Sequence, residues 1–171
     1  VESAERTARG QRALQAKIDR EDKRPSKSAE RKSSVQAGTR RQPVRMPAQH
    51  IAKPGHEHQL ELAPRFEAPD YRGSGKLDGM KAIITGADSG IGRAVAVLYA
   101  REGADVAILY LDEHDDAKET ARWVEAEGRE ALLVPGDVRD PAFCNRAAKR
   151  VAKHFGRIDV LVNNAGGWPP Q

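Results

Sequence analysis

The stretch that decides the fold is Thr85-Gly86-Ala87-Asp88-Ser89-Gly90-Ile91-Gly92. It follows the apolar segment 81–84 and leads into the mostly apolar segment 93–99, an order that predicts a strand, a glycine-rich turn and a helix. A helix that starts at such a turn aims free backbone N–H groups and the positive end of its dipole at one point. A Cβ at Gly86, Gly90 or Gly92 would obstruct a tight turn, a ligand or close packing of the helix on the strand. The stretch therefore predicts a phosphate site for a nucleotide cofactor.

Strands and helices alternate after this turn. Hydrophobic periodicity predicts helices at 90–102, 114–127 and 141–154, and strands at 80–85, 105–110, 130–135 and 159–163. The third helix begins with Asp140 as its N-cap and Pro141 at its first position. This alternation predicts an α/β fold, a doubly wound parallel sheet of strand order 3-2-1-4, with the cofactor across the carboxyl ends of the strands.

The front of the chain differs in charge and composition. Residues 1–53 carry 14 Lys/Arg and 6 Asp/Glu, whereas residues 77–171 carry 12 and 15. Residues 1–48 lack aromatic side chains and have few aliphatic ones, so we expect a disordered basic tail. Because no aromatics are interleaved for base stacking, specific nucleic-acid binding is not expected. Since the first residue is Val1, we expect a fragment or an alternative start, with Met46 as a candidate natural start.

Residues 49–76 form a third segment, in which prolines alternate with apolar side chains. This pattern predicts an extended arm that packs on the domain at 77–171 or on a neighbouring subunit. No metal site is expected, because no cysteine or carboxylate pattern completes the histidines His50, His56 and His58. The single Cys144, the lack of a membrane-length apolar run and the lack of a secretory signal favour a cytoplasmic protein.

Three signatures carry a resemblance to the short-chain dehydrogenase/reductase family over residues 77–171. They are TGxxxGIG at 85–92, Gly136-Asp137-Val138, and Asn163-Asn164-Ala165-Gly166. The arm, with Gln49-His50, Lys53-Pro54-Gly55 and the run from Tyr71 to Leu77, is similar to the N-terminal extension of general-stress or glucose/ribitol-dehydrogenase-like bacterial oxidoreductases. The resemblance implies a Rossmann-type fold and NAD(P)-dependent hydride transfer to or from a carbonyl or secondary alcohol. For the substrate, it points to a sugar or polyol. It also implies a homotetramer.

The resemblance implies cofactor contacts at Gly86, Ser89, Gly90, Ile91, Gly92, Tyr110, Asp112, Asp137, Val138, Asn163, Ala165 and Gly166. The backbone amides of the turn and the Ser89 hydroxyl would hold the pyrophosphate. Asp137 would accept a hydrogen bond from the adenine amino group while Val138 packs on the ring. Residues 163–166 would line the ribose and nicotinamide, and one of the two asparagines would tie the fourth strand to its neighbours. The alternatives are glycines that serve the turn alone, Asp137 as a loop cap, and asparagines as backbone clamps.

Cofactor preference depends on the end of the second strand. Asp112 lies 20 residues after Gly92, where an acid binds ribose hydroxyls and repels a 2′-phosphate. Family alignment on the strand instead puts Tyr110 at the usual acidic position and Leu111 where NADP-preferring relatives often have arginine. With four acids at 112–116 and no arginine nearby, we expect NAD, while Arg93 leaves a route to the NADP phosphate open.

The family's catalytic Ser, Tyr and Lys belong to the segment after Asn164, and this chain ends at Gln171. Tyr71, Tyr99 and Tyr110 are followed four positions later by Gly75, Gly103 and His114, so the chain has no Tyr-x-x-x-Lys. We therefore expect a cofactor-binding half without catalytic residues, inactive alone. Because the edge of its fourth strand and the apolar face beneath it are left open, we expect it to bind the cofactor poorly and to aggregate or dimerise. The alternative from another class is a non-catalytic nucleotide-binding or interaction module that docks through the basic tail.

Overall fold

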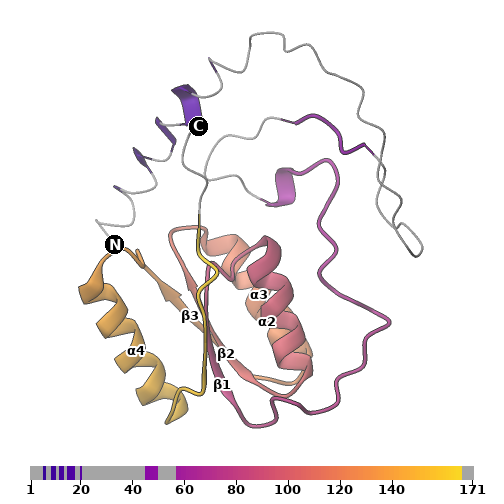
Figure 1. Ribbon diagram of the computed structural model, residues 1–171, viewed down its shortest axis with the longest axis vertical. Helices are drawn as coiled ribbons and strands as arrows, with labels where there is room; N and C mark the ends of the chain where they lie inside the picture. Colours follow the sequence, from indigo (N-terminus) through magenta and orange to yellow (C-terminus); the bar gives the residue numbers. More distant parts are fainter. Residues whose placement is uncertain are drawn as a thin grey trace.

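The computed structural model describes residues 57–166, residues 45–49 and scattered positions between 6 and 20. Figure 1 shows a sheet with helices on both faces. The elements, in chain order, are η1 (Glu57–Gln59), β1 (Lys81–Thr85), α2 (Gly90–Arg101), β2 (Asp105–Tyr110), α3 (His114–Ala126), β3 (Ala131–Pro135), α4 (Pro141–Phe155) and β4 (Val160–Val162).

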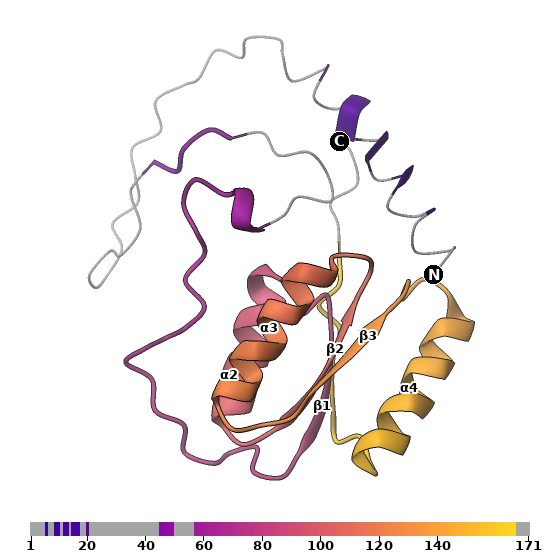
Figure 2. The same cartoon turned by 180° about the vertical axis from the view of Figure 1, so that it is seen from behind.

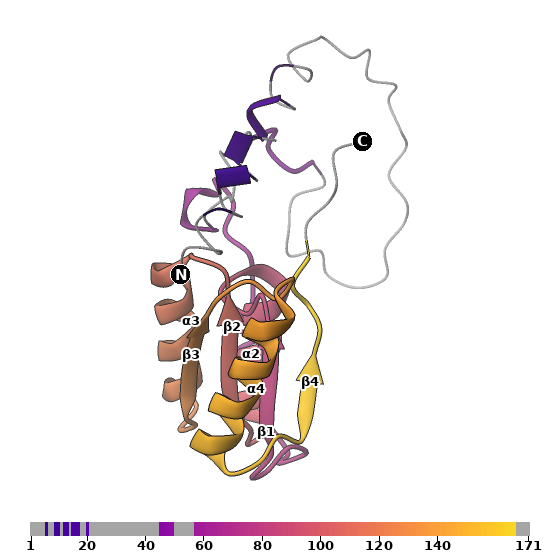
Figure 3. The same ribbon diagram turned by 90° about the vertical axis from the view of Figure 1, so that its left-hand side faces the viewer.

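The sheet is parallel and its strands lie in the order β3-β2-β1-β4, so the predicted fold class and strand order are confirmed. Helices α2 and α3 cover one face and α4 covers the other (Figure 3). The chain moves outward from β1 through β2 to β3, then crosses back to place β4 on the other side of β1. This reversal makes the carboxyl ends of β1 and β4 the switch point, where open α/β sheets bind ligands.

Alternate residues of the central strands enter two apolar layers. Ile84, Val106 and Ile108 join the cluster packed against α2 and α3. Ile83, Ala107 and Leu109 join the opposite cluster, together with Phe143, Ala147 and Val151 of α4. Because both faces are buried, the central strands are nearly continuous apolar runs, as parallel strands generally are.

The predicted element ends agree with the structure to within about two residues. The fourth strand, predicted at 159–163, is shorter in the structure, where β4 is Val160–Val162. Asp159, predicted as its first residue, lies outside the strand. Its carboxylate accepts a hydrogen bond from Lys81 N at 2.8 Å, while its own N–H donates to Lys81 O at 2.9 Å. A side chain thus replaces a backbone acceptor at the start of the ladder. Among the described residues, no helix is long and apolar enough to cross a bilayer.

The arm runs along the outer side of α2 and α3, as the front and back views both show (Figures 1 and 2). Near the carboxyl end of α2, Arg101 donates to Ala68 O at 2.8 Å. Further along, the ring of Phe66 meets Trp123 of α3 edge to face at 5.3 Å. The predicted contact between arm and domain is therefore present. The predicted disorder of residues 1–48 falls mostly outside the described residues, although the described positions between 6 and 20 have helical backbone.

Candidate functional site

The glycine-rich turn connects β1 to α2 with very little space between them. A Cβ on Gly92 would lie 2.0 Å from Gly86 O, so only glycine allows the helix to begin this close to the strand end. Gly90 has φ +53° and its missing Cβ would point into open space. Such a position accepts glycine readily and leaves the backbone accessible to a ligand. The turn therefore combines close internal packing with an open side.

Residues after β4 close over the same strand end. Asn164 Nδ2 donates to Thr85 O at 3.1 Å and to Gly86 O at 2.9 Å. The backbone N–H groups of Asn164 and Ala165 donate to Thr85 Oγ1 at 3.0 and 2.9 Å. Asn164 is thus the asparagine that ties the fourth strand to its neighbour, a choice that the sequence left open. Asn163, Ala165 and Gly166 are exposed beside it.

The start of α2 carries the donors that an anion would need. The first intrahelical bond runs from Arg93 N to Ser89 O at 3.1 Å, so the N–H groups of Gly90, Ile91 and Gly92 precede it. Gly90 N donates to a carboxylate oxygen of Glu57 at 2.5 Å. The Ile91 side chain is 76% exposed, which is unusual for an isoleucine and leaves its surroundings open. Ser89 Oγ donates to the Asp88 carboxylate at 3.0 Å, and burial raises the pKa of Asp88.

Arg93 does not face solvent. Its side chain is 3% exposed, its guanidinium donates to Thr120 Oγ1 at 2.9 Å and to Asp88 O at 2.8 Å, and it forms an ion pair with Glu57. The route from Arg93 to a cofactor phosphate, left open by the sequence, is therefore closed in this structure. The physical reason is that Asp88 O, Thr120 and Glu57 together supply acceptors for a guanidinium inside the protein.

The loop after β3 places Asp137 and Val138 at the same sheet edge. Asp137 is buried, and its carboxylate accepts hydrogen bonds from Arg139 N at 2.9 Å and from the Arg139 guanidinium at 3.1 Å. The carboxylate therefore holds its own loop, which is the loop-cap arrangement that the sequence allowed. Val138 is 37% exposed and available for an apolar contact. A direct role of Asp137 toward adenine stays a prediction.

The end of β2 holds the residues expected to decide between NAD and NADP. Tyr110 is buried in the core and its hydroxyl lies 3.0 Å from His114 Nδ1. Burial raises the pKa of Tyr110 and of Glu113. Asp112 has one oxygen 3.4 Å from the Arg12 guanidinium, while Oδ1 is buried without a hydrogen-bond partner among the described residues. The expectation of no arginine nearby is therefore wrong, because the tail brings one to Asp112.

Metal-binding geometry is absent from the described residues, in which no group of three or more His, Cys, Asp or Glu is arranged for an ion. Of the three arm histidines, His50 and His56 lie outside the described residues, and the His58 side chain is not described either. Glu57 was not anticipated as part of the site. It lies 33 residues before Gly90, and no local pattern connects the two positions.

The comparisons agree with this geometry. The family model described as "short chain dehydrogenase" matches residues 80–171. General stress protein 39 of Bacillus subtilis (strain 168) is 52% identical over 130 residues, which cover 75% of this chain and 46% of that protein. A short-chain dehydrogenase from Mycobacterium paratuberculosis bound to NAD has a TM-score of 0.54 at 37% identity, over 56% of this chain and 40% of that one.

A short-chain dehydrogenase from Burkholderia cenocepacia J2315 in complex with NADP has a TM-score of 0.53 at 43% identity, over 54% of this chain and 38% of that one. Solved relatives thus hold either nicotinamide dinucleotide. The chain spans less than half the length of the curated relatives that it matches. With its fold, its three signatures and these matches, the chain belongs to the short-chain dehydrogenase family of oxidoreductases.

Proposed function

We propose that this chain supplies the cofactor-binding part of an NAD(P)-dependent oxidoreductase that moves a hydride between nicotinamide and a carbonyl or secondary alcohol. The observation that carries the proposal is the joining of two signatures at one strand end. Asn164 and Thr85 link the glycine-rich turn to the segment after β4 through four hydrogen bonds of 2.9–3.1 Å. The joined segments lie at the switch point, where such sheets bind dinucleotides.

The residues present fit a dinucleotide. The N–H groups of Ile91 and Gly92 precede the first intrahelical bond of α2, and helix N-termini with such groups bind phosphate. We assign the pyrophosphate to these amides, with the open side of Gly90 beside them. The exposed apolar side chains of Ile91 and Val138 would contact the bound molecule. Residues 163–166 would line the nicotinamide end.

The chemistry is divided between protein and cofactor. When bound, the nicotinamide ring supplies or accepts the hydride. The protein residues described here would bind and orient it, since the hydrogen bonds of Asn164 and Thr85 keep the two signatures at a fixed separation. The proton-transferring groups of the complete protein are part of the proposal and are not assigned to residues of this chain.

We further propose NAD as the preferred cofactor. The Asp112 carboxylate at the end of β2 would accept hydrogen bonds from ribose hydroxyls and repel the extra phosphate of NADP. Its Oδ1 is buried and lacks a hydrogen-bond partner within residues 57–166 and the other described positions, which supports this role because such a polar atom is costly. The Arg12 contact works against the repulsion, but Arg12 is half exposed and such surface pairs contribute little. The expectations of a sugar or polyol substrate, a homotetramer and a cytoplasmic location belong to the same proposal, supported by the family resemblance.

Cofactor binding is tested by titrating the full 171-residue chain with NADH and with NADPH while following nicotinamide fluorescence. We expect weak but saturable binding of both, tighter for NADH. Gly92→Ala should abolish binding, because its Cβ would meet Gly86 O. The control is Gly128→Ala, at a helix end where a Cβ would meet nothing within 4 Å. Its φ of +76° strains an alanine there, so this variant tests backbone strain away from the turn and should keep binding. No binding of either dinucleotide to the folded chain would contradict the proposal.

A further inference from the structure

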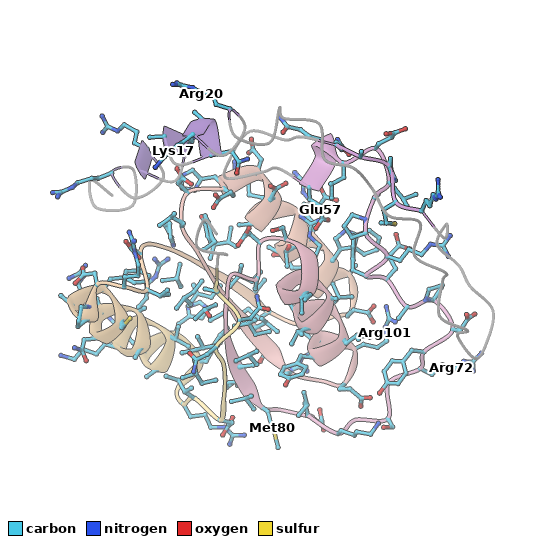
Figure 4. The ribbon with its side chains drawn as sticks, turned by 45° about the horizontal axis from the view of Figure 1, so that its top comes forward. Lys17, Arg20, Glu57, Arg72, Met80 and Arg101 are labelled. Carbon is cyan, nitrogen blue, oxygen red and sulfur yellow. The ribbon has the colours of Figure 1, made fainter. Side chains whose placement is uncertain are left out.

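The arm reaches the glycine-rich turn through one side chain. Glu57, on η1, is 9% exposed, and its carboxylate accepts a hydrogen bond from Gly90 N at 2.5 Å and pairs with the Arg93 guanidinium. Figure 4 labels Glu57 and Arg101 toward opposite ends of α2. We propose that Glu57 is a positioning residue: it fixes the first turn of α2, so the cofactor site takes its binding geometry only when the arm is seated.

The surroundings of Arg93 show why this carboxylate matters. A buried guanidinium needs an opposite charge and hydrogen-bond acceptors, and removal of the partner from such a pair is strongly destabilising. Two other carboxylates approach Arg93 only at 3.9 Å (Asp116) and 4.0 Å (Glu119), both from α3. Within the part of the chain that the structure describes, Glu57 is the carboxylate nearest the Arg93 side chain, and its oxygen accepts a hydrogen bond from the guanidinium. Loss of Glu57 would therefore leave Arg93 underpaired one residue after Gly92.

A second residue of the arm, Phe66, lies against the same arginine as Glu57. Phe66 packs against Trp123 at 5.3 Å, and the Arg93 guanidinium lies 5.2 Å from the Phe66 ring centre. Phe66 and Glu57 therefore contact the same arginine from two points of the arm. Arg93 in turn holds Asp88 O in the middle of the turn through Nε at 3.2 Å and through a second nitrogen at 2.8 Å. The arm, Arg93 and the turn form one connected unit.

The charge on Glu57 bears on whether it positions the turn or competes with a bound phosphate for the start of α2. A carboxylate at the start of a helix resembles a bound phosphate, and in that case Glu57 would have to leave before a dinucleotide could bind. Glu57, however, is neutralised by Arg93 and occupies the N–H of Gly90, while the N–H groups of Ile91 and Gly92 follow in the same helical turn. The geometry thus favours a carboxylate that holds the turn, with competition as the outcome that would overturn it.

The test rests on the proposed function for one of its two readouts and is independent of it for the other. The full chain is compared with Glu57→Gln, Glu57→Ala and the exposed-arm control Glu67→Gln. The first readout, without cofactor, is the amide exchange of Gly90, Ile91 and Gly92 by nuclear magnetic resonance. The second is NADH affinity. A near-ultraviolet circular dichroism spectrum and a thermal melt establish that each variant is folded.

We expect Glu57→Ala to accelerate exchange at these three amides and to weaken NADH binding by about tenfold, because the binding-competent turn is then populated a fraction of the time. Glu57→Gln keeps an acceptor for the Gly90 N–H but removes the negative charge that pairs with Arg93, so its effect should be intermediate. In the Arg93→Gln background, the further change Glu57→Gln should cost less than it does in wild type, as expected for a coupled pair. Glu67→Gln should match wild type in both readouts.

Unchanged amide exchange in a folded Glu57→Ala variant would overturn the inference, and so would NADH affinity equal to or tighter than that of wild type. Tighter binding would identify Glu57 as a competitor of the phosphate. If wild type fails to bind NADH while Glu57→Ala still accelerates exchange at 90–92, the proposed function fails and the positioning of the turn stands. The two failures are therefore distinguishable.

Discussion

The arm holds both ends of α2, but the carboxylate that accepts the hydrogen bonds lies on the helix side at one end and on the arm at the other. At the carboxyl end the carboxylate belongs to the helix cap: Glu102 accepts hydrogen bonds from Tyr71, Ser74 and Lys76 of the arm. At the amino end the carboxylate belongs to the arm: Glu57 accepts from Gly90 and Arg93 of the helix. A helix carboxyl end repels negative charge and an amino end attracts it, so Glu102 needs its several donors whereas Glu57 benefits from the dipole.

The location of the two ends gives them different tasks. The carboxyl end of α2 lies away from the strand ends that carry the signatures, and the donors around Glu102 serve to hold the arm. The amino end follows directly from β1 and holds the turn that Asn164 contacts. One arm segment thus contributes to stability at one end of the helix and to the shape of the candidate site at the other.

The largest effect is expected from glycines at the two ends. Gly92→Ala places a Cβ 2.0 Å from Gly86 O, and Gly103→Ala places one 2.8 Å from Asp78 Cα at φ +102°. Both should lower the free energy of unfolding, by about 1–3 kcal/mol or more for overpacking of this kind. Only Gly92→Ala should abolish NADH binding. Urea unfolding and fluorescence titration measure the two quantities, and retained binding by Gly92→Ala would break the comparison.

The second prediction concerns pH at the carboxyl end. Hydrogen bonds from Tyr71, then from the backbone of Lys76 and Ser74, hold the pKa of Glu102 far below its ordinary value of 4.5. A lowered folded-state pKa contributes stability above pH 4.5 that is lost as pH falls toward the folded-state pKa. Glu102→Gln should therefore lower stability at pH 7 and flatten this acid dependence. Urea unfolding between pH 3 and pH 7, with Glu67→Gln as control, measures both, and an unchanged slope would contradict the account.

At the amino end of α2, Asp88 should change the free energy of unfolding with pH in the direction opposite to Glu102. Burial raises the pKa of Asp88 above its ordinary value of 3.8. A raised folded-state pKa in an acid favours the protonated form, so this contribution is present below pH 3.8 and is lost as pH rises through the folded-state pKa. Asp88→Asn should remove that loss and steepen the net decline of stability on acidification. The same unfolding series measures it. A flatter profile in Asp88→Asn, like that expected for Glu102→Gln, would show that the two ends do not differ in this way.

The smallest effect is expected at the neighbouring end of β2. Asp112→Ala should reduce the preference for NADH over NADPH by a factor on the order of ten, equivalent to about 1.4 kcal/mol. Asp115→Ala is the matched control, because the Asp115 side chain is 98% exposed and pairs only with Lys118 of its own helix among the ion pairs of the described residues. Parallel titrations with both dinucleotides measure the ratio. Equal loss of preference in both variants would assign the effect to net charge rather than to position.

The order of the elements was predictable from the sequence because it depends on local periodicity. The apolar stripe of α2 and the continuous apolar run of β2 are visible in single segments, and Asp140 with Pro141 marks the start of α4. The glycine-rich turn was also predictable, because its residues are adjacent in the sequence and a strand and a helix this close leave no room for side chains. The structure shows this at Gly92, where a Cβ would meet Gly86 O.

Packing of the arm on the domain was predictable, but the residue pairs that make the contacts between distant segments were not. Glu57 and Arg93 are 36 residues apart, and Arg12 and Asp112 are 100 apart, so no spacing rule links them. The choice between Asn163 and Asn164 depends on which side chain reaches Thr85, and adjacent residues at a strand end point in different directions. Burial of Arg93 likewise required Thr120 and Asp88 O to be placed by tertiary packing.

The central claim is that the amino end of α2 is the dinucleotide site and the carboxyl end is not. The most direct measurement is a titration of isotope-labelled full chain with NADH, followed through its backbone amide resonances. The account predicts shifts concentrated at residues 86–92, 137–138 and 163–166, with residues 71–76 and 101–103 unmoved. Absence of shifts at 86–92, or shifts confined to the residues around Glu102, would contradict it.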